Sequence, residues 1–271
     1  MTDEIVVNLS MLHFGEEPPI TGSNGSGAVF FEGCSLGCPF CQNYKISRGS
    51  TGKGTAYTGD QLAEEFLRLE SLGAHNINLV TPMHFAPGVA LSIEKAKNRG
   101  LRIPVLINTG GYDKAETLKL FDGLVDIYLP DMKFFSGKLS YEVLKVRDYR
   151  ETAERALEEM YRQTGEVVME DGIMKKGMIV RHLMIPGQLF DTKKVLDFLT
   201  DRYLNRIYIS LMNQYTPMPQ LNDLTVPDYL KRKLPEGHYR AATDHLILTG
   251  HELFFTQEDA SGDLMIPGFK R

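Results

Sequence analysis

Residues 22–44 read GSNGSGAVFFEGCSLGCPFCQNY and contain Cys34, Cys38 and Cys41, which are the only 3 cysteines in the 271-residue chain. Three is an odd number, and these cysteines are too close in sequence to form a disulfide that would brace a fold. Thiolates confined to one short loop are instead typical of a metal site. The stretch therefore predicts a loop that binds a metal.

The cysteine loop leaves the coordination of that metal incomplete. A structural zinc ion takes four protein ligands, and a four-iron cluster usually takes four cysteines. The spacing is compatible with a zinc site completed by one of the 7 histidines, with an iron–sulfur cluster that has an open position, and with cysteines that bind no metal. A metal with an open position would be able to take part in chemistry.

The spacing Cys-x3-Cys-x2-Cys, with Phe40 directly before the last cysteine, resembles the cluster loop of the radical S-adenosylmethionine superfamily. Gln42 and Asn43 after it, and the glycine-rich strand before it, resemble more narrowly the pyruvate formate-lyase activating enzymes, which activate glycyl radical enzymes. The resemblance implies a [4Fe-4S] cluster on the three cysteines, with S-adenosylmethionine chelating the fourth iron and Phe40 among the residues that bind this cofactor. It also implies reductive cleavage of this cofactor to a 5′-deoxyadenosyl radical, which abstracts hydrogen from a substrate.

The resemblance also implies partners for the chain. These are a glycyl radical enzyme as protein substrate and a flavodoxin- or ferredoxin-like protein as electron donor. A peptide or a small metabolite is the alternative substrate, and a metal-binding module without catalysis is the alternative of another class. The chain has no further cysteine, so we expect no auxiliary iron–sulfur cluster within it.

Composition excludes several other classes of function. The net charge of -5 and the pI near 5.8 provide no basic stripe that could neutralise phosphates, so we expect no nucleic-acid partner. No apolar run approaches the length of a bilayer, and the first residues are acidic where a secretory signal would be basic. Reduced thiols and an oxygen-sensitive cluster suit the cytoplasm, which is the expected location, away from any membrane.

The chain downstream of the glycines alternates between buried strands and amphipathic helices. Such alternation predicts a parallel sheet with right-handed crossovers. Six βα units are too few for a closed eight-stranded barrel and predict a partial (β/α)6 TIM-like open barrel, the fold that the resemblance also implies. The predicted strands are Ala28–Phe31, Asn76–Val80, Ile103–Ile107, Leu124–Leu129, Met178–Ile185 and Arg206–Met212.

We expect a single domain over residues 1–271, with a core at about 21–217 and a C-terminal extension at about 218–271. The region from Leu139 to Tyr161 predicts one long helix, and the polar stretch around Asp171 predicts a hairpin or loop insert. Near the C-terminus, Leu253 to Phe255 predict an additional edge strand.

Polar residues follow the second and third predicted strands, and ligands of parallel α/β proteins bind at the C-terminal ends of the strands. Thr81 and His84 lie where the resembled family has a Gly-Gly-Glu turn that binds the methionine amino group. They are candidate replacements, His84 as a neutral imidazole, although an ordinary structural role for this histidine is the alternative. Asn108 takes the place of an aspartate of the family near the cofactor.

Charged residues mark the ends of the fourth and fifth predicted strands. Asp131 and Lys133 resemble the Asp-Leu-Lys motif of the activating enzymes, in which both residues lie beside the cofactor, and the Lys133 ammonium suits the methionine carboxylate. Arg181 lies within an apolar strand and should point into the barrel towards a carboxylate, for which the cofactor is the candidate. Asn24 replaces an acidic residue of the family, and the surrounding glycines predict a close approach of the backbone to the cofactor or substrate.

Overall fold

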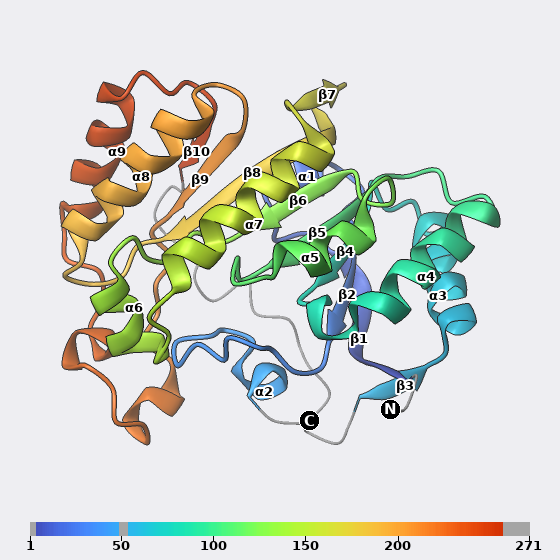
Figure 1. Ribbon diagram of the computed structural model, residues 1–271, viewed down its shortest axis with the longest axis horizontal. Helices are drawn as coiled ribbons and strands as arrows, with labels where there is room; N and C mark the ends of the chain where they lie inside the picture. Colours follow the sequence, from blue (N-terminus) through green and yellow to red (C-terminus); the bar gives the residue numbers. More distant parts are fainter. Residues whose placement is uncertain (1–3, 49–53, 257–271) are drawn as a thin grey trace.

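The structure is a computed structural model that describes residues 4–48 and 54–256. One twisted sheet forms its centre, with helices packed on it (Figure 1). The strands are β1 (Ile5–His13), β2 (Ser26–Phe31), β3 (Thr55–Tyr57), β4 (Ile77–Val80), β5 (Val105–Thr109), β6 (Ile127–Pro130), β7 (Val168–Glu170), β8 (Ile173–Leu183), β9 (Tyr208–Met212) and β10 (Phe254–Thr256). The α-helices are α1 (Pro18–Thr21), α2 (Tyr44–Ser47), α3 (Gly59–Ser71), α4 (Ala86–Asn98), α5 (Ala115–Leu118), α6 (Gly137–Leu144), α7 (Tyr149–Thr164), α8 (Leu189–Tyr203) and α9 (His238–Leu248).

The order of strands in the sheet follows the chain. Strands β2, β4, β5, β6, β8, β9 and β10 pair in parallel in this order, and they include all six predicted strands. β1 pairs antiparallel with β2, and β3 pairs antiparallel with β1. Within the described residues the sheet begins at β3 and ends at β10 without closing, which confirms the partial TIM-like barrel.

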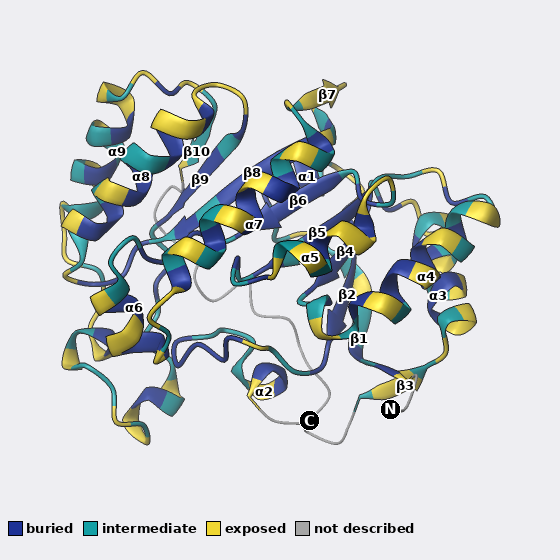
Figure 2. Ribbon diagram, in the orientation of Figure 1, coloured by how far each residue is buried: buried dark blue, intermediate teal, exposed yellow. Residues whose placement is uncertain are grey.

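The longer helices cover the outer face of the sheet and bury apolar residues against it (Figure 2). In α3, Leu62, Phe66 and Leu69 recur at helical spacing and are fully buried. The helix begins at a capping box, because the Thr58 hydroxyl accepts from the Gln61 N–H and the Gln61 side chain accepts from the Thr58 N–H. The outer layer thus consists of amphipathic helices, as the hydrophobic pattern of the sequence predicted.

The inner face of the sheet is filled at one end by α1, which the sequence did not predict. Ile20 of α1 is fully buried and shares a core with residues that alternate with the helix-facing residues of β5, β6 and β8. These residues are Leu106, Ile127, Leu129, Met174 and Ile179. α1 therefore plugs the barrel at the end opposite to the cysteine loop.

The glycine-rich segment 22–27 was expected to let the backbone approach the cofactor or substrate, and this prediction is wrong. The segment leads into the first residues of β2, whereas the cysteine loop follows the last ones. Its contacts are with the start of β4, because the Gly27 N–H donates to the Asn76 carbonyl and the His75 N–H donates to the Gly25 carbonyl. The glycines serve the turn between α1 and β2.

Three other local predictions have different outcomes. The single helix expected from Leu139 to Tyr161 is two helices, α6 and α7, because Lys145 adopts a left-handed backbone (φ 63°) that ends α6. The hairpin predicted around Asp171 is confirmed, since β7 pairs antiparallel with β8 there. The edge strand predicted near the C-terminus is confirmed as β10.

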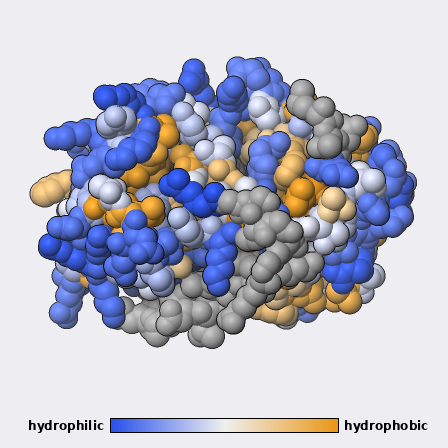
Figure 3. Space-filling model, turned by 90° about the horizontal axis from the view of Figure 1, so that it is seen from below, coloured by the Kyte–Doolittle hydropathy of each residue, from blue (hydrophilic) through white to orange (hydrophobic). Residues whose placement is uncertain are grey.

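The part of the predicted C-terminal extension that the structure describes packs on the main core. Leu221, Leu230 and Leu246 are buried in the same cluster as the helix-facing residues of the sheet. In the view of Figure 3, hydrophilic residues cover much of the coloured surface, and hydrophobic residues form separate patches among them. No helix in residues 4–48 and 54–256 is both long and apolar enough to cross a bilayer.

Candidate active site

A cavity of about 440 Å³ lies at the C-terminal ends of the parallel strands, where the sequence placed the site. Its wall contains all three cysteines and six of the seven predicted cofactor residues. These residues are Cys34, Cys38, Cys41, Phe40, Thr81, Asn108, Asp131, Lys133 and Arg181. The cavity therefore gathers residues from β2, β4, β5, β6 and β8.

The cysteine loop has a fixed backbone. Gly33 has φ 95°, a conformation that favours glycine, and its N–H donates to the Ile46 carbonyl at 2.7 Å. The Cys41 N–H donates to the Cys38 carbonyl at 3.1 Å, which closes a tight turn around Phe40. The thiols are thus held on a preformed loop between β2 and α2.

The chemical state of the three thiols is suited to binding a positively charged metal group. All three are free, and burial raises the pKa of Cys38 to about 12 despite the nearby Lys133 ammonium. Burial also raises the pKa of Cys41, against a hydrogen bond from Ser47. Buried thiols of this kind ionise when a metal supplies compensating positive charge, so the donor set fits an iron–sulfur cluster. Within the described residues no three His, Cys, Asp or Glu side chains converge on a single-ion site. A cluster does not require such convergence, because each cysteine binds its own iron.

Two residues near the C-terminal end of the predicted core support the loop, Tyr215 within it and Gln220 beyond it. The Gln220 amide donates to the carbonyls of Pro39 and Cys41, each at 3.3 Å. The rings of Phe40 and Tyr215 lie 6.1 Å apart, and the Tyr215 hydroxyl donates to the Leu230 carbonyl at 2.6 Å. Gln220 was not predicted from the sequence, because no local pattern marks a residue that contacts a loop so distant in the chain.

Asp131 and Lys133 form an ion pair on the cavity wall. Burial disfavours the charged ammonium and by itself would lower the pKa of Lys133. The attraction of the Asp131 carboxylate opposes this effect, and the pKa of Lys133 lies above its usual range. The fully buried Tyr149 of α7 fixes the backbone here, because its hydroxyl accepts from the Lys133 N–H at 2.9 Å. The same hydroxyl lies 3.0 Å from the carbonyls of Gly110 and Asp131, so it joins the ends of β5 and β6.

Thr81 and Asn108 lie next to each other on the wall, whereas His84 does not line the cavity. The Thr81 N–H donates to the Asn108 carbonyl at 2.8 Å, and Thr81 has the left-handed φ of 61°. The His84 ring donates to the Glu32 carbonyl at 2.7 Å, just before the cysteine loop, and burial lowers the pKa of His84. These contacts favour a structural role for His84, which was the alternative in the sequence. A contact between His84 and the cofactor stays a prediction.

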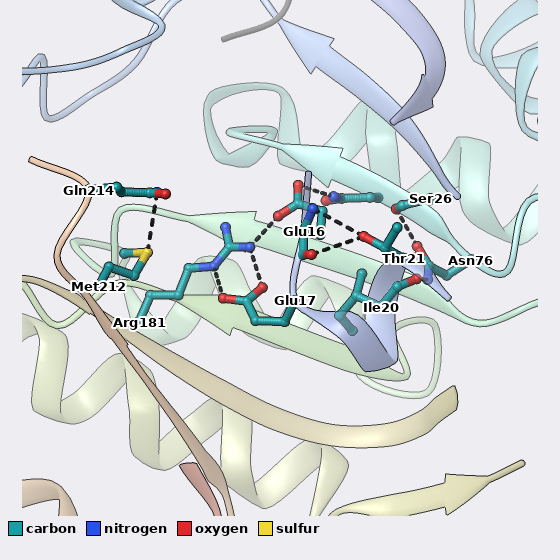
Figure 4. Close-up of polar contacts among 10 residues, drawn as sticks. Glu16, Glu17, Ile20, Thr21, Ser26, Asn76, Arg181, Met212 and Gln214 are labelled. Carbon is teal, nitrogen blue, oxygen red and sulfur yellow. Dashed lines mark hydrogen bonds and ion pairs between the residues drawn. The ribbon is translucent and has the colours of Figure 1, made fainter. Parts of the chain in front are cut away.

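Arg181 points into the barrel towards carboxylates, as expected, but these belong to Glu16 and Glu17 (Figure 4). Burial disfavours the charged guanidinium and by itself would lower the pKa of Arg181. The attraction of the two glutamates is larger than this effect and raises the pKa. Burial likewise opposes ionisation of Glu17, but Arg181 keeps the pKa of Glu17 below its usual range. Neither glutamate was predicted from the sequence as a site residue. Binding of the cofactor carboxylate by Arg181 stays a prediction.

Comparisons with solved structures agree with this fold. Methylornithine synthase superposes with a TM-score of 0.50 over 80% of this chain and 60% of that protein, at 15% identity. SuiB of Streptococcus suis, solved with bound S-adenosylmethionine, superposes with a TM-score of 0.51 over 83% of this chain and 45% of that protein, also at 15% identity. At this identity the likeness concerns the fold alone.

Comparisons of sequence identify the family. An uncharacterized protein of Methanocaldococcus jannaschii is 27% identical over 220 residues, which cover 79% of this chain. The match spans only 60% of the length of that curated relative. Residues 28–199 match the radical SAM superfamily, whose enzymes use a [4Fe-4S] cluster and S-adenosylmethionine. The cysteine loop, the strand ends and the open barrel all lie in or beside the matched region, and the chain belongs to the radical SAM superfamily.

Proposed function

We propose that this radical SAM enzyme is similar to the glycyl-radical-enzyme activases and abstracts hydrogen from a protein partner. The observation that carries the proposal is the gathering of Cys34, Cys38 and Cys41 with the Asp131–Lys133 pair on one cavity wall. The Cys-x3-Cys-x2-Cys spacing and the Asp-x-Lys pair are the motifs that resemble the activases. An open barrel also suits a large substrate.

Each residue of the wall has a proposed role. The three cysteines hold the cluster, and the bound cluster and cofactor supply one-electron cleavage of the sulfonium bond. Lys133 binds the methionine carboxylate, with Asp131 as its counter-charge. Thr81 and Asn108 offer hydrogen-bonding groups to the cofactor, and Phe40 covers the cysteine turn with an apolar ring that excludes water. The donor is a flavodoxin- or ferredoxin-like protein in the cytoplasm, where free thiols persist.

A second candidate is a radical SAM enzyme that acts on a peptide or a small metabolite. The size of the cavity favours it, because about 440 Å³ is in the range of small-molecule sites. The ionised floor formed by Glu16, Glu17 and Arg181 is also able to bind a polar small molecule.

Anaerobic reconstitution tests the proposal. We expect about four irons per chain and, after reduction, cleavage of S-adenosylmethionine to 5′-deoxyadenosine. Cys38→Ala should abolish cleavage, whereas Ser35→Ala, an exposed change in the same loop, should retain it. Bound zinc without cofactor cleavage would refute the assignment.

Electron paramagnetic resonance separates the two candidate substrates. The reduced enzyme is mixed with S-adenosylmethionine and with candidate glycyl radical enzymes from its own cell. A glycyl radical on the partner supports the activase-like function. Deoxyadenosine formation that depends on a metabolite or peptide, with no partner radical, supports the second candidate.

A further inference from the structure

The segment from Asp131 to Ser136 links β6 to α6 and carries the Asp131–Lys133 pair of the cavity wall. It lies outside any helix or strand, so contacts with other elements have to hold its shape. Met132 lies between the two charged residues and is fully buried. The direction in which Lys133 enters the cavity therefore depends on what binds the backbone around Met132.

His182 holds this backbone from the outer face of the sheet. It follows Arg181 in β8, and neighbouring residues of a strand point to opposite faces, so its imidazole lies on the side of the helices. Its Nδ1 atom lies 2.7 Å from the Met132 carbonyl oxygen, and its Nε2 atom lies 3.0 Å from the Thr192 hydroxyl of α8. His182 and Thr192 are both buried. The ring thus bridges the Asp131–Ser136 segment and the first turn of α8.

The two partners determine which ring nitrogen of His182 carries the proton. A carbonyl oxygen only accepts hydrogen bonds, so Nδ1 is the donor to Met132. Burial lowers the pKa of His182, which keeps the ring neutral at neutral pH. Nε2 then has a lone pair and accepts from the Thr192 hydroxyl. The contacts therefore select the tautomer with its proton on Nδ1.

The peptide unit between Met132 and Lys133 is held at both of its polar groups. Its carbonyl accepts from His182, and its N–H donates to the Tyr149 hydroxyl at 2.9 Å. A peptide unit is planar, so hydrogen bonds at its two opposite edges prevent it from rotating. Its orientation sets the direction in which the Lys133 side chain leaves the backbone. His182 and Tyr149 together therefore direct that side chain.

We propose that His182 is a positioning residue for the cofactor. By donating from Nδ1 it fixes the Met132–Lys133 peptide unit and so aims the Lys133 ammonium at the carboxylate of S-adenosylmethionine. The inference rests on the proposed function, in which Lys133 binds that carboxylate, and it adds a residue behind the wall to the site. His182 does not line the cavity, so it acts on the cofactor only through Lys133.

Two amide variants of His182 test the proposal, because each keeps one of the two hydrogen bonds. His182→Asn places its amide nitrogen near the position of Nδ1 and retains the donor to Met132. His182→Gln places its amide near the position of Nε2 and loses that donor. Dissociation constants for S-adenosylmethionine are measured on the oxidised, anaerobic holoenzyme, in which the cofactor is not cleaved. We expect His182→Gln to bind about tenfold more weakly than the wild type and His182→Asn to stay within about threefold of it.

Stability separates positioning from a purely structural role. Each variant loses one hydrogen bond of the same buried ring, so the Tm values of the two should fall by similar amounts. A difference in affinity between them then reports the Met132 contact rather than a loosened fold. His251→Asn is the matched control, since His251 is also a buried histidine and its Nε2 donates to the Leu253 carbonyl at 3.0 Å, outside the cavity wall. It should lower the Tm and leave the affinity unchanged.

A double-mutant cycle shows whether His182 acts through Lys133. In the background of Lys133→Met, the further change His182→Gln should have no effect on the affinity for S-adenosylmethionine, because the ammonium that it directs is gone. Effects of the two changes that simply multiply contradict the proposal. Equal affinities of His182→Asn and His182→Gln overturn it as well, as does weaker binding by His182→Asn.

Nitrogen chemical shifts of labelled histidines test the same geometry in the wild type, without any substitution. The His182 ring should be neutral with its proton on Nδ1, and a proton on Nε2 overturns the proposal. A wild type that holds no cluster or does not cleave the cofactor refutes the proposed function instead. An intact, cleaving enzyme in which the two amide variants bind the cofactor equally well refutes only this inference.

Discussion

Thr81 has a backbone conformation that its side chain disfavours. Its φ of 61° lies in the left-handed region, where a β-branched residue is an outlier. The residue follows β4, lines the cavity and hydrogen-bonds to Asn108. Strain that persists at the wall of a site is a sign that the side chain is needed there.

We therefore expect Thr81→Gly to stabilise the fold by about 1 kcal/mol, because glycine relieves the strain at some cost in chain entropy. The same change should weaken S-adenosylmethionine binding. Chemical denaturation and equilibrium binding measure the two effects. Thr81→Ala keeps most of the strain and removes the hydroxyl, so it should lose affinity without gaining stability. A destabilised glycine variant would show that the backbone is not strained.

Asp113 gives the protein a predictable dependence on pH. Burial raises the pKa of Asp113 from 3.8 to about 6, and the hydrogen bond from the Thr109 hydroxyl at 2.5 Å only partly opposes this. Between these two values the folded protein retains a proton that the unfolded chain releases. The stabilisation is therefore complete below pH 3.8 and is lost as the pH rises through about 6.

Asp113→Asn should remove this dependence, because the amide cannot ionise and its oxygen still accepts from Thr109. We expect the wild type to lose up to about 3 kcal/mol relative to the variant over this range, from two pKa units at 1.36 kcal/mol each. Urea denaturation of both proteins in a pH series is the measurement. Parallel curves for the two proteins would mean that folding does not change the pKa of Asp113.

At the scale of elements, β5, β6 and the start of α7 act as one unit through Tyr149. Its hydroxyl contacts the backbone of Gly110, Asp131 and Lys133. The break between α6 and α7 at Lys145 makes Tyr149 the first residue of α7. Sequence reasoning predicted an unbroken helix here, because no glycine or proline marks the left-handed residue.

Tyr149→Phe should destabilise the protein by about 1–3 kcal/mol, because it leaves the Lys133 N–H buried without an acceptor. Cofactor affinity should fall as well, since the Lys133 backbone is no longer fixed. Tyr161→Phe on the same helix is the control and should change neither quantity by a comparable amount. Chemical denaturation measures the change in stability, and binding titrations measure the affinity for the cofactor. An unchanged cofactor affinity would limit Tyr149 to a role in stability.

The six parallel strands were predictable because each is a short apolar run between polar segments, and burial on both faces requires such runs. β1 was missed, because it joins the edge of the sheet antiparallel and its exposure is mixed along its length. α1 was missed because four residues provide no helical period. The repeating strands were therefore predictable from the sequence, whereas β1 and α1 were not.

Across the whole molecule, the site combines residues that are neighbours in the sequence with residues that are far apart in it. Three cysteines within one loop indicate a metal site, and the resemblance of their spacing to the radical S-adenosylmethionine superfamily predicts the cluster. The pairing of Arg181 with Glu17 joins residues 164 positions apart, and no local pattern reports such a contact. The sequence therefore predicted the metal side of the cavity and missed the glutamates of its floor.

The C-terminal part of the chain also belongs to the site, through Gln220. Gln220→Ala removes two hydrogen bonds to the cysteine loop, so the cluster should be lost more rapidly to a chelator. Overall stability should change by about 1 kcal/mol or less, because the bonds are only partly buried. Absorbance decay of the holoprotein measures the loss, with the exposed Asn222→Ala as control. Equal decay rates would show that the loop keeps its shape unaided.

The plug formed by α1 has a consequence for protein engineering. The chain passes from Glu16 through α1 and β2 directly into the cysteine loop, so the floor of the cavity and its metal side lie on one continuous segment. If residues 14–41 were transplanted as one cassette between related barrels, the cavity floor and the cysteine loop would be transferred together. The cassette would include β2, the strand that sets the distance between them. A chimera with a junction inside β2 would separate them and disturb the register that β2 shares with β1 and β4.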